Sequence, residues 1–307
     1  MRALFSERNL PNEIDAMNPP LELIRLLRPQ QWVKSLFVLV GLLFSHAWGD
    51  TSLIWRVLAA AGGFSLVSSC IYILNDIVDR EPDRLHPVKR NRPLARGSVS
   101  LNAAMMLAVV VGTLGGVLGY YASPLVAMML AIYSLMNIAY TLGLKRVVIL
   151  DVFIIATGFM LRILAGTSGV GIPPSQWLLL CGLMLTLFLG FVKRRAELKH
   201  AKANENGQRK VLHDYSPALL DPMITITAAG IIMSYSLYTL SPETIALHGT
   251  SLLMLSVPFV IYGVFRYLFL LHRYSQGEDA ATEIVHDAHL VVTFFTWLAV
   301  TIWVIAR

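Results

Sequence analysis

Long apolar segments follow one another along the chain, separated by shorter polar connections. Nine of them approach the roughly 20 apolar residues that a helix needs to cross a bilayer: 33–49, 53–74, 103–121, 123–142, 147–166, 176–192, 219–240, 251–271 and 288–306. The pattern predicts an all-α, polytopic membrane protein with nine transmembrane helices. Because this number is odd, we expect the two termini on opposite sides of the membrane.

Composition supports this prediction and limits the domain organisation. Hydrophobic residues make up 56% of the chain and charged residues 14%, and the mean hydropathy of +0.62 lies well outside the soluble globular range. No connection is long enough to fold by itself. We therefore expect a cytoplasmic N-terminal tail at 1–20, without a cleaved signal peptide, and a single transmembrane domain at 21–307.

Lys and Arg are distributed very unequally between the two sets of connections. The segments 75–102, 143–146 and 193–218 are rich in Lys and Arg, whereas 50–52, 121–123, 167–175 and 241–250 contain neither. Basic residues stay on the cytoplasmic side during insertion, so we expect the N-terminus inside and Arg307 outside. The net charge of +6 is explained by topology and contact with membrane lipids, and nucleic acid binding is not expected.

The first polar cluster follows the second predicted span. Asn75, Asp76, Asp79 and Asp83 are spaced so that a continuous helix would align the three carboxylates on one face. Pro82 is expected to end or kink that helix, so that Asp83 approaches from a loop. Oxygen ligands suit Mg²⁺, which usually completes its coordination with water and phosphate oxygens. The cluster predicts a Mg²⁺ site for a diphosphate, with a solvated acidic helix end as the alternative.

Three further groups of polar residues occur at predicted helix ends. Basic side chains suited to phosphate binding are Lys89, Arg90 and Arg92 in one connection, and Lys193, Arg194 and Arg195, followed by Glu197, in another. Arg28 and Gln31 precede the first span and Lys34 lies at its start; these residues are candidate anion ligands. The alternatives are ordinary positive-inside charge and anchoring to lipid head groups. The three adjacent cations at 193–195 predict one phosphate-sized positive patch.

Asp151 lies one turn inside an apolar segment, after the polar stretch from Tyr140 to Lys145. A carboxylate at that depth needs a cation or a metal, and Lys145 is the candidate partner, with a structural salt bridge as the alternative. Weaker signals are a single Glu283-x-x-His286 unit, which lacks the second unit of a di-iron site, and a mid-span Arg162 that fits no mechanism.

The order of spans and the motif Asn75-Asp76-x-x-Asp79-x-x-x-Asp83 resemble the UbiA superfamily of intramembrane prenyltransferases. The resemblance covers nearly the whole chain. It implies a UbiA-type helical bundle in which Mg²⁺ on the acidic motif holds a diphosphate leaving group. It also implies a lateral opening that admits a polyprenyl chain.

Details are more similar to one branch, the decaprenyl-phosphate phosphoribosyltransferases of the bacterial cytoplasmic membrane. The similar stretches are Arg28 to Lys34, Tyr140 to Asp151 and Phe191 to Leu198. Aromatic prenyltransferases of the superfamily usually carry a second Asp-x-x-x-Asp motif where this chain has Lys193-Arg194-Arg195. Two anionic substrates need such cations, whereas a neutral phenol does not. One departure is Ser35, where the branch leads us to expect Asn.

The resemblance implies Mg²⁺-dependent transfer from 5-phosphoribosyl diphosphate to a polyprenyl phosphate, at a cytoplasmic site that serves cell envelope biosynthesis. Asn75 and the three aspartates would hold Mg²⁺ and the diphosphate, Lys145 and Asp151 would position ribose or diphosphate, and residues 193–195 would bind the lipid phosphate or the ribose 5-phosphate, oriented by Glu197. An aromatic polyprenyltransferase is the alternative enzyme. A transporter that uses Asp151 and Arg162 is the alternative of another class.

Overall fold

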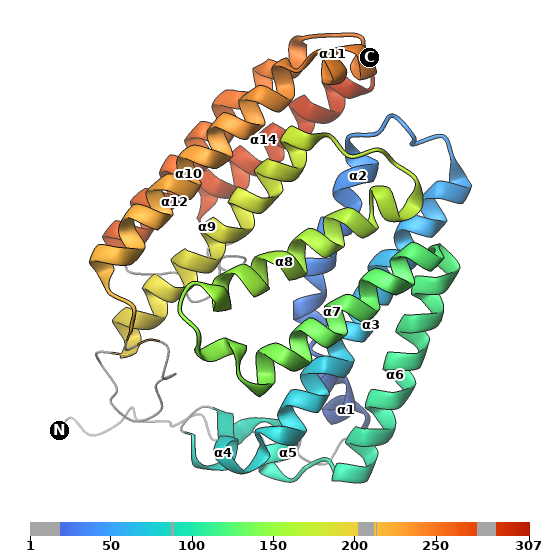
Figure 1. The fold of residues 1–307 in the computed structure, drawn as a ribbon, viewed down its shortest axis with the longest axis vertical. Coiled ribbons are helices and arrows are strands. Elements are labelled where there is room, and N and C mark those ends of the chain that lie inside the picture. The colour runs from blue at the N-terminus through green and yellow to red at the C-terminus, as the bar shows by residue number, and fades with distance from the viewer. Residues whose placement is uncertain (1–18, 87–88, 202–211, 213, 275–286) are drawn as a thin grey trace, which may run out of the picture.

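Regular structure is entirely helical in the residues that the computed structural model describes, namely 19–86, 89–201, 212, 214–274 and 287–307. The long helices are α3 (Thr51–Val78), α6 (Leu101–Ala122), α7 (Pro124–Leu142), α8 (Leu150–Ala165), α9 (Gln176–Ala201), α10 (Pro217–Leu240), α12 (Val257–Tyr274) and α14 (Ala288–Ile305). In Figure 1, α3, α6 and α7 form one side of the bundle, α9, α10, α12 and α14 form the other, and α8 connects them. The all-α prediction is confirmed.

Eight helices in the described part of the chain are long and apolar enough to cross a membrane, and they coincide with eight of the nine predicted spans. The remaining predicted span, 33–49, holds the 3₁₀ helix η2 (Pro29–Leu39) and the short α2 (Val40–Leu43). The predicted N-terminal tail lies outside the described residues up to 18, and α1 (Pro19–Leu27) begins at its end.

The tight crossing of η2 and α2 over the end of α8 depends on two glycines. A Cβ on Gly166 would lie 1.7 Å from the carbonyl oxygen of Val38, and one on Gly41 would lie 2.1 Å from the carbonyl oxygen of Gly166. Only residues without a side chain allow the two backbones to approach this closely. These glycines therefore fix η2 against α8, and η2 also packs on α3.

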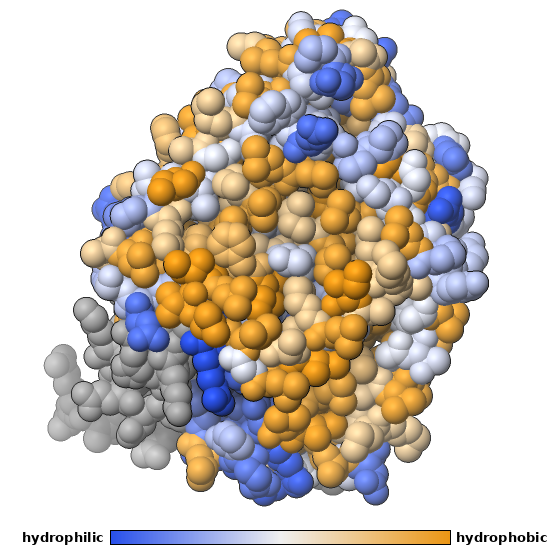
Figure 2. All heavy atoms as spheres, in the orientation of Figure 1, coloured by the Kyte–Doolittle hydropathy of each residue, from blue (hydrophilic) through white to orange (hydrophobic). Residues whose placement is uncertain are grey.

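Burial identifies the inner and outer helices. In the most apolar 18-residue stretch of each span, 50% of α3 and 56% of the span that begins with α8 is buried. The corresponding share is 22% in α6, α7 and α14. Figure 2 shows apolar side chains across the middle of one face, with hydrophilic residues chiefly toward its ends. Exposed apolar residues on the long helices include Val109, Val117, Leu135, Ile226, Phe265 and Val292. Such a belt fits a lipid environment, since an aqueous surface rarely exposes so much apolar area.

The break after α3 differs from the prediction. The helix ends at Val78, Asp79 occupies its C-cap position, and Asp83 lies on the short helix α4 (Arg80–Leu85). The expected break at Pro82 and the loop position of Asp83 are therefore wrong. Pro82 lies in the first turn of α4, where its missing N–H removes no helical hydrogen bond.

Candidate functional site

The elements that carry the acidic motif gather at one end of α3. Helices α1, α4 and α5 (Pro93–Arg96) lie together there in Figure 1, at the opposite end of the molecule from α11 (Pro242–His248). The 3₁₀ turn η3 (Lys89–Asn91) connects to α5. The chain thus folds back over the end of α3, so that residues from several short elements can meet Asp76.

Two arginines neutralise the buried carboxylates of Asp76 and Asp83. Arg28 Nη2 donates to both oxygens of Asp76, at 2.6 and 2.8 Å. Arg92 Nη1 donates to Asp76 Oδ1 at 3.0 Å and to Asp83 Oδ2 at 2.6 Å. The aspartate side chains are only 3–4% exposed, against 25% for Arg28 and 27% for Arg92. We call Arg28, Asp76, Asp83 and Arg92 the acidic cluster.

The other residues of the predicted metal set lie beside this cluster. Asn75 Oδ1 accepts a hydrogen bond from Thr141 Oγ1 at 2.9 Å, which ties the end of α3 to the end of α7. Lys89 Nζ lies 4.0 Å from Asp83 Oδ1, whereas the Arg90 side chain is exposed. Asp79 lies at the C-cap position of α3, three residues after Asp76.

The carboxylate oxygens of Asp76 and Asp83 make the acidic cluster suitable for a divalent cation. Within the described ranges, no three His, Cys, Asp or Glu side chains converge as a ready metal site. Arg92 Nη1 nevertheless bridges carboxylates of two helices, Asp76 on α3 and Asp83 on α4, so positive charge is already held between them. Carboxylate oxygens of this kind are ligands that Mg²⁺ prefers.

A second cluster surrounds Asp151, whose side chain is fully buried. Arg194 Nε donates to Asp151 Oδ2 at 2.6 Å, and the Arg194 side chain is itself 1% exposed. Arg194 also donates to Glu197 through Nη1 and to the Tyr140 hydroxyl through Nη2, the latter at 3.4 Å. The expected pairing of Asp151 with Lys145 is wrong, because α9 packs against α8 and brings Arg194 to the carboxylate.

The backbone before Asp151 is strained. Ile149 has φ 69° and ψ −48°, and Leu150 N–H donates to the Val148 carbonyl at 2.8 Å, which defines a γ-turn that is rare and costly for a β-branched residue. Tyr215 holds this turn, because its hydroxyl accepts from Ile149 N–H at 2.8 Å and donates to Asp151 Oδ1 at 2.6 Å. Burial and the hydrogen bond to Asp151 raise the pKa of Tyr215 above its ordinary value of 10, so the hydroxyl remains a donor at neutral pH.

The two clusters meet at the end of α7. Tyr140 contacts Arg194 of the second cluster, and the next residue, Thr141, contacts Asn75 beside the acidic cluster. Adjacent residues of one helix therefore contact both groups, which places the two clusters near the same end of α7. The sequence brought Asp151 and Tyr140 into the candidate set but gave no reason to include Thr141 or Tyr215.

The three cations at the end of α9 do not form one patch. Arg194 is buried on Asp151, Arg195 pairs with Asp221 on α10 at 2.7 Å, and Lys193 is exposed. Successive residues of a helix point about 100° apart, so each side chain meets different surroundings. The predicted single positive patch is therefore wrong, and Arg194 alone of the three joins Asp151.

Arg28, Gln31 and Lys34 lie along η2 at intervals of three residues, with Arg28 as its N-cap. In a 3₁₀ helix, residues three apart align on one edge. The unexpected 3₁₀ geometry therefore places Gln31 and Lys34 on one edge of η2, which begins directly after Arg28.

A comparison with known families identifies the family of this chain. The model of the UbiA prenyltransferase family matches residues 35–299. The chain belongs to the UbiA prenyltransferase family. As a member of this family it is a transferase.

Relatives of this UbiA-family protein carry more specific names. It is 32% identical to a decaprenyl-phosphate phosphoribosyltransferase of Mycolicibacterium smegmatis, with 96% of this chain and 95% of the relative covered. It is 33% identical to the enzyme of the same name from Corynebacterium glutamicum, with 84% of this chain and 76% of the relative covered.

Solved structures support the fold. A UbiA homologue from Archaeoglobus fulgidus bound to GPP and Mg²⁺ superposes with a TM-score of 0.69 over 93% of this chain and 100% of the homologue, at 17% identity. A digeranylgeranylglyceryl phosphate synthase superposes with a TM-score of 0.66 over 95% of this chain and 100% of that enzyme, at 21% identity. The UbiA-type bundle is thus confirmed at the level of the fold.

Glu22 ties helix α1 of this UbiA-family protein to the segment that carries Arg92. Its buried carboxylate accepts from Arg25 Nη1 at 2.6 Å, Arg96 Nη2 at 2.6 Å and Ser98 Oγ at 2.8 Å. Burial opposes ionisation, but the hydrogen bonds from Ser98 and Arg96 outweigh it and lower the pKa of Glu22 below 4.5. Glu22 thus holds α1 against the segment that carries Arg92, and no spacing in the sequence pointed to this role.

We expect Glu22→Gln to lower the free energy of unfolding by about 2 kcal/mol at pH 7, because charge-assisted hydrogen bonds are lost. A lowered carboxyl pKa stabilises the fold above pH 4.5, and this contribution is lost as pH falls through the folded-state pKa. Thermal unfolding in detergent should therefore show a gap between variant and wild type that narrows below about pH 4. A difference in unfolding temperature between Glu22→Gln and wild type that is as large below about pH 4 as at pH 7 would contradict this role. The control is Glu81→Gln, which changes an exposed carboxylate.

Arg162 has partners other than a carboxylate in the described structure. Its Nη1 donates to the Gly158 carbonyl at 2.8 Å, and Nη2 donates to Ser68 at 2.8 Å and to Tyr133 at 3.0 Å. The guanidinium carbon also lies 5.3 Å from the centre of the Phe64 ring. Arg162 thus links α8 to α3 and α7. Asp151 is not among its hydrogen-bond partners in the described residues.

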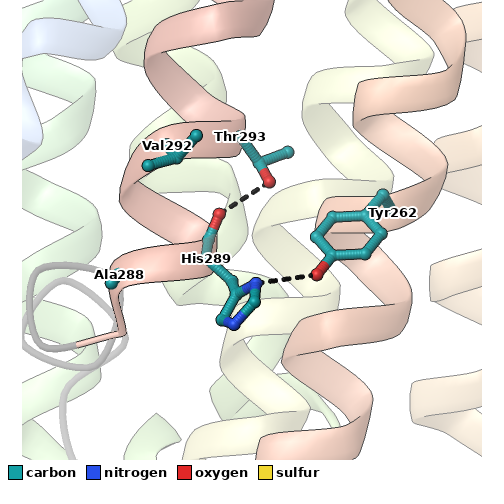
Figure 3. Close-up of a pocket in the computed structure, with 5 residues that line it drawn as sticks. All are labelled: Tyr262, Ala288, His289, Val292 and Thr293. Carbon is teal, nitrogen blue, oxygen red and sulfur yellow. Dashed lines mark hydrogen bonds between the residues drawn. The ribbon is translucent and has the colours of Figure 1, made fainter.

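A shallow pocket between α12 and α14 lies apart from the predicted site residues (Figure 3). Its lining includes Tyr262, whose hydroxyl lies 3.1 Å from His289 Nδ1, and Thr293, which donates to the His289 carbonyl at 2.6 Å. None of the residues assigned to the diphosphate or its acceptor lines it. The Glu283-x-x-His286 unit lies outside the described residues.

Proposed function

We propose that the chain transfers the 5-phosphoribosyl group from 5-phosphoribosyl diphosphate to a polyprenyl phosphate, in a Mg²⁺-dependent reaction. The bond between ribose C1 and the diphosphate oxygen breaks, a bond between C1 and a lipid phosphate oxygen forms, and diphosphate leaves. A phosphate nucleophile is already ionised at neutral pH, so no general base is required.

The observation that carries this proposal is the composition of the two polar clusters that meet the end of α7. One side offers buried carboxylates with arginines, and the other offers the buried Arg194 in place of a second acidic motif. A site with cations on both sides suits two phosphorylated substrates. The names of relatives that cover almost the whole chain support the same donor and acceptor.

The residues divide into groups with different tasks. Asn75, Asp76, Asp79 and Asp83 would hold Mg²⁺, which neutralises charge on the departing diphosphate when bound. Arg28, Gln31, Lys34, Lys89, Arg90 and Arg92 would bind the diphosphate. Tyr140, Lys145 and Asp151 would position the ribose or the diphosphate, and Arg194, oriented by Glu197, would bind the lipid phosphate or the ribose 5-phosphate.

The membrane arrangement is part of the proposal. Nine spans, with η2 and α2 as the first, would form one transmembrane catalytic domain at 21–307 in the bacterial cytoplasmic membrane. The N-terminus and the polar site would face the cytoplasm, where a soluble sugar diphosphate is available, and Arg307 would lie outside. The acceptor chain would enter from the bilayer.

We expect purified protein in detergent with Mg²⁺ to transfer label from 5-phosphoribosyl diphosphate into the lipid fraction when polyprenyl phosphate is present. Absence of labelled lipid with an intact, folded protein would contradict the proposal. Formation of a prenylated ring from geranyl diphosphate and 4-hydroxybenzoate would instead support an aromatic polyprenyltransferase.

A further inference from the structure

The acidic cluster contains as many guanidinium groups as carboxylates before any metal binds. Two carboxylates, Asp76 and Asp83, face two guanidinium groups, Arg28 and Arg92, and one nitrogen of Arg92 contacts both carboxylates. The two positive charges equal the charge of one divalent cation. Two adjacent carboxylates that are 3–4% exposed would be costly to bury without such compensation.

We propose that Arg92, assisted by Arg28, is an internal counter-cation that keeps free divalent metal out of the acidic cluster and moves to the diphosphate when metal and diphosphate bind together. The inference rests on the proposed function, since it needs a diphosphate that binds at this cluster. It adds an order of events: metal by itself binds weakly, and the metal–diphosphate complex binds strongly.

Charge balance decides between these two events. Metal that enters without an anion must displace two arginines and leave them close to the new cation, and like charges in a poorly solvated site repel strongly. Diphosphate that enters with the metal gives the displaced guanidinium groups new acceptors, with which they form paired, charge-assisted hydrogen bonds. The site thus favours the complex over either ion.

The backbone around both arginines permits this exchange. Arg28 is the N-cap of η2, with φ 52° and ψ 59°, and Arg92 is the N-cap of α5, with φ −64° and ψ 144°. Both side chains are about a quarter exposed, whereas the carboxylates are buried on helices. The arginine side chains can therefore turn while Asp76 and Asp83 remain in place.

The test is Mn²⁺ binding to the purified, full-length protein, measured by electron paramagnetic resonance of free Mn²⁺ with and without inorganic diphosphate. We expect Arg92→Gln to tighten Mn²⁺ binding without diphosphate by about tenfold, equivalent to about 1.4 kcal/mol. The same variant should lose most of the gain in Mn²⁺ affinity that diphosphate gives the wild type. Tighter Mn²⁺ binding without diphosphate, together with a smaller gain from diphosphate, is expected only if Arg92 acts as a counter-cation.

Two variants serve as controls. Arg84→Gln removes the same charge from the same segment, but Arg84 contacts Glu81 and the Ala95 carbonyl, so Mn²⁺ affinity should stay at the wild-type value. Arg92→Lys keeps a cation and should keep free Mn²⁺ binding weak. Unchanged thermal unfolding of Arg92→Gln would show that the fold is intact.

The outcomes separate this inference from the proposed function. If the wild type binds Mn²⁺ with diphosphate but Arg92→Gln leaves Mn²⁺ binding without diphosphate unchanged or weaker, the counter-cation role is overturned and the diphosphate site stands. If the folded wild type binds no Mn²⁺ in either condition, the metal–diphosphate site fails, and the counter-cation role fails with it.

Discussion

Asp76→Asn is expected to lower turnover by on the order of 100- to 1,000-fold while the protein still inserts and folds. Asp76 is the carboxylate on which Arg28 and Arg92 converge. An amide of the same shape cannot supply the negative charge that holds a metal and two guanidinium groups. The measurement is the initial rate of labelled lipid formation at saturating donor and acceptor. We expect the same direction of change for Asp79→Asn, from its place beside the cluster.

Glu81→Gln is the matched control for this prediction. Glu81 lies in the same stretch of sequence, but its side chain is 71% exposed and its contact is with Arg84 at 3.0 Å. A neutral amide at this position should leave the rate within about twofold of the wild type, because exposed ion pairs contribute little. An Asp76→Asn variant with more than a tenth of wild-type activity would remove Asp76 from the site.

The second large effect is on stability and concerns the buried pair of Asp151 and Arg194. Asp151→Ala should lower the free energy of unfolding by about 3–5 kcal/mol, because it breaks a buried ion pair. The loss includes the hydrogen bond from Tyr215, whose hydroxyl also holds the strained Ile149 turn. Thermal unfolding of the purified protein in detergent measures this change.

A double variant separates the structural role of this pair from its part in the reaction. Asp151→Leu with Arg194→Met removes both charges and keeps apolar volume, and such replacements often restore stability. We expect the double variant to unfold near the wild-type temperature and yet to lack transferase activity. A stable double variant with wild-type activity would show that the pair only supports the fold.

The sequence predicted the elements of this protein better than the pairing between them. Span positions follow from long apolar segments, since a bilayer demands them, and the acidic motif stood out because carboxylates are rare in such a chain. Arg28 is 48 residues from Asp76, and Arg194 is 43 residues from Asp151. Local spacing cannot show such pairs, because they depend on how the helices pack.

Local geometry accounts for the remaining differences. The helix break at Asp79 rather than Pro82 arises because proline is accepted in the first turn of α4. The 3₁₀ form of η2 aligns Gln31 with Lys34, and close backbone contact at Gly166 fixes η2 against α8. Tyr215 and Thr141 were missed because hydroxyl residues are common at helix ends and carry no distinctive spacing.

The most direct test of the central claim is the dependence of diphosphate release on the lipid acceptor. With 5-phosphoribosyl diphosphate as donor, the protein should release one diphosphate for each polyprenyl phosphate consumed, and the lipid product should carry a 5-phosphoribosyl group by mass spectrometry. Release should stop in the absence of polyprenyl phosphate and in Asp76→Asn. Diphosphate release from geranyl diphosphate, with none from 5-phosphoribosyl diphosphate, would contradict the account.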